Sequence, residues 1–125
     1  MLVRFSILEA DPDSGQKAGV LVAAHTLRDE GELSAQEHEQ VRSALQWFNE
    51  HVEVPEVLEA EGNHRAISWF KPAARVAISK MWELKSLLEH HGLHVEVLRT
   101  LDPGLVVYED ELQVVAKPRR GQRFR

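Results

Sequence analysis

Hydrophobic and polar positions alternate in two regions, near the N-terminus and again in the last third of the chain. In residues 2–8, Val3, Phe5 and Ile7 share one side while Arg4 and Ser6 take the other, which is typical of a β-strand. The same reasoning predicts four more strands, at residues 66–70, 93–97, 105–108 and 112–116.

Apolar residues recur at helical spacing in two segments of the first half. Residues 17–30 fit a helix that ends at Gly31, a residue that readily takes the left-handed conformation after a helix. The run Val20-Leu21-Val22 also suits the start of a strand, so both interpretations of this segment stay open. The sequence Ser34-Ala35-Gln36-Glu37 is a capping box and predicts a helix that runs to about Glu50.

The longest predicted helix spans residues 72–91, between Pro72 and Gly92. Proline suits the first position of a helix because its missing amide hydrogen would have no partner there. Asp102-Pro103-Gly104 predicts a turn, with proline at one corner and glycine free to take positive φ at the next. The resulting order, β-α-α-β-α-β-β-β, predicts an α+β fold whose mixed or antiparallel sheet carries helices on one face.

The chain has 125 residues, enough for one domain, and it has no cysteine. Disulfides, thiolate catalysis and zinc–thiolate sites are therefore excluded. The N-terminus does not read as a signal peptide, and the apolar run 18–24 is too short to span a membrane. We expect a cytoplasmic protein without membrane association, with one domain over residues 1–117 and a flexible basic tail over residues 118–125.

Charge is divided along the sequence. Residues 1–61 carry thirteen acids and four bases, whereas residues 62–125 carry seven acids and eleven bases. The two parts thus have net charges of −9 and +4. This asymmetry predicts a partner of one sign or a protein with two oppositely charged faces.

Bases gather where the helix 72–91 is expected to begin, although that end of a helix favours acids. Lys71 and Arg75 are four residues apart and would share a face, with His64 and Arg65 in the preceding loop. This pattern predicts an anion-binding site on the helix amides and these four side chains. The alternative is internal pairing with acids of the 53–61 loop.

The C-terminal tail is the second basic cluster. Arginine neutralises phosphates, and arginine and phenylalanine both stack on unpaired bases, so the tail is a candidate site for single-stranded nucleic acid. The alternatives are a solvated terminus or a strap over the acidic half of the protein. The candidate residues are Lys117, Arg119, Arg120, Arg123, Phe124 and Arg125.

Two tryptophans lie beside apolar helical stripes and not on them. Trp47 and Trp82 are therefore either the rim of the core or a contact patch for a partner or a second copy. His90, His91 and His94 lie close in sequence, but no local acid completes a metal site, and we expect no metal. No phosphate-binding glycine loop is present, and we expect no cofactor.

Three segments carry a resemblance to known sequences: Trp47-Phe48-Asn49-Glu50, Ile67-Ser68-Trp69-Phe70-Lys71, and residues 103–110. They are similar to a family of small uncharacterised bacterial proteins, over most of the chain except the tail. The resemblance implies a compact domain and attaches no activity.

The basic clusters together predict a small soluble binding or regulatory module for an anionic partner. That partner would be a nucleic acid, a phosphate-bearing ligand or an acidic protein surface. One alternative is a protein–protein interaction module, in which homodimerisation is possible. The other is a small hydrolase or transferase whose site lies within residues 64–75 and includes Ser68.

Overall fold

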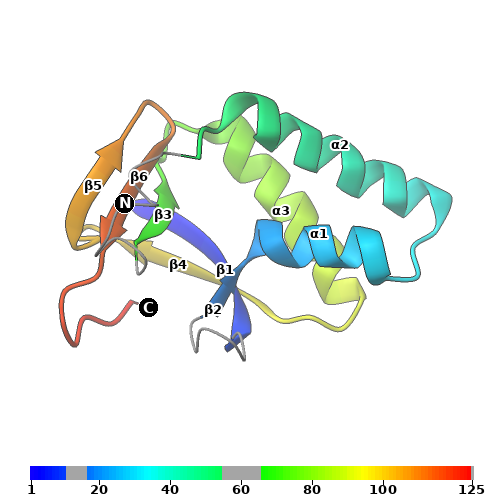
Figure 1. The fold of residues 1–125 in the computed structure, drawn as a ribbon, viewed down its shortest axis with the longest axis horizontal. Coiled ribbons are helices and arrows are strands. Elements are labelled where there is room, and N and C mark those ends of the chain that lie inside the picture. The colour runs from blue at the N-terminus through cyan, green and yellow to red at the C-terminus, as the bar shows by residue number, and fades with distance from the viewer. Residues whose placement is uncertain (11–16, 55–65, 125) are drawn as a thin grey trace. The chain divides into compact units, whose positions relative to one another are not determined.

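The computed structural model describes residues 1–10, 17–54 and 66–124 (Figure 1). The predicted α+β class is confirmed. The elements follow the predicted order with one short strand added. They are β1 (Leu2–Ala10), β2 (Lys17–Gly19), α1 (Val20–Glu30), α2 (Ala35–His51), β3 (Ile67–Phe70), α3 (Arg75–His90), β4 (Val95–Thr100), β5 (Leu105–Glu109) and β6 (Gln113–Lys117).

The sheet has the strand order β2-β1-β3-β6-β5, and β4 pairs with β1 off this path. Every strand pair whose register is described is antiparallel. The tightest part is the hairpin of β5 and β6, in which Leu105 lies opposite Lys117. Strand β5 stands at the edge of the sheet, and a bulge interrupts its register between Val106 and Tyr108.

The residue contacts divide the chain into two compact units. The sheet unit comprises residues 1–4, 52–78 and 98–125, and the helical unit comprises residues 5–51 and 79–97. Each unit has its own buried apolar residues. In the sheet unit they are Trp69, Phe70, Ala74, Ala77, Val114, Val115 and Ala116.

In the helical unit the predicted apolar stripes are buried. They include Val41, Ala44, Leu45 and Phe48 of α2 and Met81, Leu84 and Leu88 of α3. The capping box at the start of α2 is confirmed: the Ser34 amide donates to Glu37, and the Glu37 amide donates to the Ser34 hydroxyl, each at 3.1 Å. The Ser34 amide, followed by the imidazole of His91, lowers the pKa of Glu37. Local sequence therefore fixes where this helix begins.

Glycine ends two helices in different ways. Gly92 has φ 89° and closes α3 as predicted, with its amide bonded to the Glu89 carbonyl and the Leu93 amide bonded to the Leu88 carbonyl. Gly31 follows α1 but is extended, at φ −83°, so the predicted left-handed conformation there is wrong. The physical reason for glycine is space, because a Cβ at this position would lie 2.5 Å from the Leu27 carbonyl oxygen.

Two predicted boundaries are also corrected. Helix α3 begins at Arg75 and not at Pro72, because the Ala74 amide bonds back to the Lys71 carbonyl in a turn. Strand β4 begins at Val95 and not at Leu93, whose amide is still occupied by the end of α3. The segment 17–30, which the sequence left open, is strand over its first three residues and helix from Val20.

The candidate anion-binding surface of the C-terminal segment

The predicted site at the start of α3 is only partly described. His64 and Arg65 lie outside the described residues, as do the acids of the predicted 53–61 loop other than Glu53. Lys71 precedes the helix, and its ammonium lies 2.7 Å from the Glu109 carboxylate at the end of β5. Arg75 is exposed at the first position of α3. The structure thus supplies an internal anion for Lys71 and does not place Lys71 and Arg75 on one helical face.

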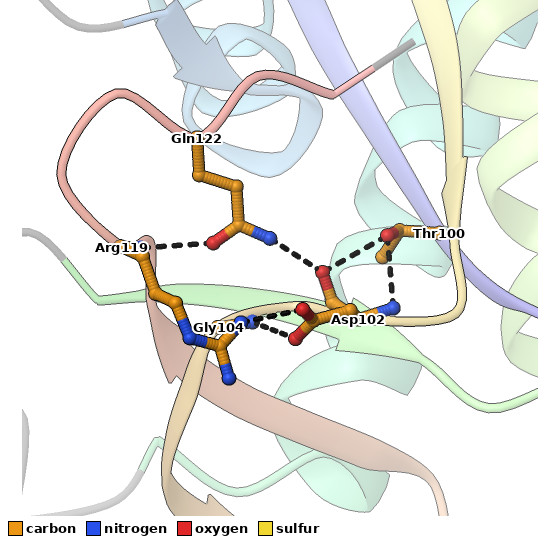
Figure 2. Close-up of polar contacts among 5 residues, drawn as sticks. All are labelled: Thr100, Asp102, Gly104, Arg119 and Gln122. Carbon is orange, nitrogen blue, oxygen red and sulfur yellow. Dashed lines mark hydrogen bonds and ion pairs between the residues drawn. The ribbon is translucent and has the colours of Figure 1, made fainter.

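The C-terminal strap, residues 118–124, runs along the sheet unit and is fastened to the turn between β4 and β5. Figure 2 shows that Arg119 and Gln122 both reach Asp102. The Arg119 guanidinium pairs with the Asp102 carboxylate, and the Gln122 side-chain amide donates to the Asp102 carbonyl oxygen at 2.7 Å. Asp102 is therefore the anchor of the strap.

Asp102 is itself held by its own turn. Its carboxylate accepts the Gly104 amide at 3.1 Å, and its amide donates to the Thr100 hydroxyl at 3.1 Å. The Arg119 guanidinium, followed by the Gly104 amide, lowers the pKa of the Asp102 carboxyl. The anchor is consequently ionised at neutral pH and presents a fixed negative charge to the strap.

Gly104 sets the position of this turn against the end of β6. It has φ 107°, and a Cβ there would lie 2.2 Å from the Lys117 carbonyl oxygen. Only glycine permits both the conformation and the close approach. The predicted role of glycine in this turn is confirmed, and the contact brings Asp102 next to the point where the strap leaves β6.

The far end of the strap is held by an aromatic contact. The Phe124 and Trp69 rings lie edge to face, with centroids 4.8 Å apart. Trp69 is fully buried, and its indole N–H has no acceptor in the part of the chain that the structure describes. Phe124 therefore faces the sheet unit's own core in this structure.

Three bases in the strap or directly before it take no part in holding it to the sheet unit. Lys117, Arg120 and Arg123 form no ion pair with any described residue. The Gln122 amide bonds to the Arg119 carbonyl at 2.9 Å and Gly121 has φ 77°, which together define a type II turn. Arg120 occupies the outer corner of that turn, and nothing lies within 4 Å of the position of a Cβ on Gly121. Arg125 lies outside the described residues.

Exposed apolar side chains lie in the same unit, in the turn before β5 and in β5 itself. Leu101 precedes the anchor and is 81% exposed, and Leu105 and Val106 of the edge strand are 59% and 47% exposed. Leu105 lies directly across the hairpin from Lys117. The surface therefore combines positive charge with apolar area.

The charge division follows the two units. The sheet unit carries ten bases and eight acids in its sequence, and the helical unit carries five bases and twelve acids. Their net charges are +2 and −7. The strap is fastened to the basic unit to which it belongs, at Asp102 and Trp69.

The remaining candidate residues lie apart from the strap. In the helical unit, Trp47 stacks on His51 with centroids 4.5 Å apart, and Trp82 is 42% exposed with its ring edge to face with Phe5. In the sheet unit, the Ser68 hydroxyl donates to the Gln113 side-chain oxygen at 2.7 Å. That hydroxyl is thus bonded to an amide and not to a general base.

Metal and membrane signals are absent from the described part of the chain. Residues 1–10, 17–54 and 66–124 contain no group of three histidine or acidic side chains placed to hold a metal ion. His90 and His91 lie edge to face, and His91 bonds Glu37 at 2.8 Å. Among the described helices, none has both the length and the apolar character of a membrane span.

Sequence reasoning missed Asp102 as a binding residue. The Asp-Pro-Gly pattern indicated a turn, but its partners Arg119 and Gln122 lie 17 and 20 residues away. The only sequence signal for this pairing is the density of arginines in the tail, which indicates a need for an acidic partner. Comparisons with protein-family models, with curated proteins and with solved structures find no match to this chain.

Proposed function

We propose that the protein is a binding module for an anionic partner and that the partner is an acidic protein segment. The observation that carries the proposal is that some residues of the strap bind the protein itself and others do not. Arg119, Gln122 and Phe124 hold it in place, whereas the bases between them and just before them form no ion pair with any described residue. The contact residues of the proposal are Lys117, Arg120 and Arg123.

The preformed turn of the strap favours binding because less conformational entropy is lost when the partner binds. Ordering a free arginine-rich terminus on a partner costs conformational entropy at the moment of binding. Here the turn at residues 119–122 is already formed by its own hydrogen bond. The bases attract an acidic partner at a distance and add specificity at contact, an effect that salt weakens.

A protein partner is favoured over a nucleic acid by two features. In the protein without a partner, Phe124, the only aromatic residue of the strap, packs against Trp69 and so does not offer its ring to unpaired bases at first contact. The exposed Leu105, which lies opposite Lys117, and Leu101, which precedes Asp102, need apolar area in the partner, which an acidic protein segment supplies and a phosphate backbone does not. Interfaces that exclude water around apolar side chains and place charges at the rim are typical of protein complexes.

The test compares two polyanions, poly-glutamate and a single-stranded oligo-thymidine, at low and high salt. Replacing both Arg120 and Arg123 by alanine should weaken poly-glutamate binding about tenfold, from roughly 1 kcal/mol or less per charged contact. The matched control is Arg28→Ala with Arg42→Ala, which removes the same charge from bases already paired with Asp29 and Glu39.

The control should keep its affinity to within about twofold. An equal loss in both double variants would reduce the effect to net charge and refute a site on the strap. Tighter and equally salt-dependent binding of oligo-thymidine would replace the acidic protein by a nucleic acid.

A further inference from the structure

Arg119 of the strap pairs with the anchor Asp102 at a solvent-exposed position. The Arg119–Asp102 pair is exposed, with 58% and 62% of the two side chains accessible. Exposed ion pairs exchange readily with outside charges, because water and salt already screen them. A carboxylate of the partner can therefore compete with Asp102 for the same guanidinium.

The turn at residues 119–122 links Arg119, which pairs with the anchor Asp102, to the aromatic contact of Phe124. The Gln122 amide bonds to the Arg119 carbonyl, and Phe124 follows two residues later. A displacement of Arg119 that carries this turn away from Asp102 consequently moves the segment that carries Phe124. The contact of the two rings, at 4.8 Å, depends on that segment.

One property of Trp69 favours the departure of Phe124. The indole N–H of Trp69 is buried without an acceptor among the described residues. A buried donor without a partner is costly, and access to water would satisfy it. If the departure of Phe124 admits water to this N–H, the donor gains the acceptor that it lacks among the described residues.

We infer that the strap is a displaceable cover and that Asp102 is an internal competitor of the partner. Partner carboxylates take Arg119 from Asp102, the turn moves away from the anchor with its own hydrogen bond intact, and Phe124 leaves Trp69. This inference rests on the proposed function and adds its regulation: the affinity of the surface is held down by the protein's own acid. It also assigns Trp69 as an apolar site that becomes accessible only in the complex.

The competition is tested with Asp102→Asn. Asparagine keeps an oxygen that accepts the Gly104 amide. The turn between β4 and β5 is therefore retained, while the charge that holds Arg119 is lost. Poly-glutamate should bind this variant about two- to fivefold more tightly than the wild type, the effect of freeing one exposed ion pair. Glu111→Gln is the matched control, since it removes one acid of the same unit outside the anchor and should change the affinity less than twofold.

The departure of Phe124 from Trp69 is measured by fluorescence in a protein whose single tryptophan is Trp69. The chain has three tryptophans, and Trp47→Phe with Trp82→Phe leaves Trp69 alone. Acrylamide quenching of Trp69 should rise when poly-glutamate saturates the protein, and it should rise in Asp102→Asn before any ligand is added. In Phe124→Ala the quenching should be high from the start and insensitive to poly-glutamate.

The outcomes separate the two proposals. Poly-glutamate binding with unchanged Trp69 quenching and no gain in Asp102→Asn would overturn the cover and leave the proposed function standing. No binding of poly-glutamate by the wild type would overturn the proposed function, and with it the competition. A gain in affinity together with increased quenching would support both.

Discussion

The hydroxyl of Tyr108 lies between two carboxylates in the sheet unit. Its oxygen lies 3.0 Å from the Asp110 carboxylate and 3.3 Å from the Glu53 carboxylate, and its single proton is shared between these two acceptors. The hydrogen bond to Asp110, with burial and the charges of both acids, raises the pKa of Tyr108 to about 12. A phenolate at this position would lose the donor and face two negative charges.

This tyrosine is the only one in the chain, so its titration can be followed by phenolate absorbance without overlap from another tyrosine. We predict a midpoint near pH 12 in the folded protein, compared with an ordinary tyrosine pKa of 10.0. Because the folded pKa is raised, the stabilisation is complete below pH 10 and is lost as the pH rises toward 12.

Asp110→Asn should move this midpoint down toward the ordinary value, and Glu53→Gln should move it less. The protein unfolded in urea serves as the reference. A midpoint near the reference in the folded wild type would show that the hydroxyl is not held between the two acids.

Single residues show where sequence reasoning stops. The capping role of Ser34 was predictable because its partner Glu37 is three residues away. Lys71 was placed correctly as a base in need of an acid, but its partner Glu109 lies 38 residues later on another strand. Pairings of that range depend on strand register, which the pattern of apolar residues does not specify.

Two glycines that end elements have positive φ but different surroundings. Gly92 closes α3 with φ 89° and has nothing within 4 Å of a Cβ position, whereas Gly104 has φ 107° and the Lys117 carbonyl at 2.2 Å. They form a natural pair for separating backbone strain from steric exclusion.

Gly104→Ala should lower the free energy of unfolding by roughly 3 kcal/mol or more, because strain and a backbone clash add. Gly92→Ala, the control, should cost about 1–2 kcal/mol from conformation alone. Urea denaturation of both variants provides the measurement. Similar losses for the two would mean that the turn yields and that the close approach is not required.

The elements were mostly predictable because most lie within segments of clear period. Strands β3, β5 and β6 and helix α2 lie within about a residue of their expected bounds. The errors arose where one residue type serves two purposes. Pro72 suited the first turn of a helix but lies in a turn before it, and the short β2 was concealed beside an apolar run that continues as helix.

At the scale of the molecule, the charge of the sequence halves differs from the charge of the structural units. The halves carry −9 and +4, and the units carry −7 and +2. The difference arises because residues 52–61, which are acidic, belong to the sheet unit. The basic character of that unit is therefore concentrated at the strap and is not general.

Ending the chain at Lys117 tests whether residues 118–125 are an independent tail or part of the sheet unit. The structure's contacts at Arg119, Gln122 and Phe124 predict a loss of about 2 kcal/mol in the free energy of unfolding, mostly from the aromatic contact. Phe124→Ala should reproduce most of this loss in thermal and urea unfolding. An unchanged stability would favour the flexible tail expected from composition.

The bulge in β5 has a consequence for how the protein behaves at high concentration. Edge strands with apolar side chains template the addition of further strands, and β5 contains Leu-Val-Val-Tyr without lysine or proline. The register shift between Val106 and Tyr108 breaks the regular row of amides and carbonyls that an added strand would need. We therefore expect the extra residue in the edge strand to disfavour the addition of further strands and with it fibrous self-assembly.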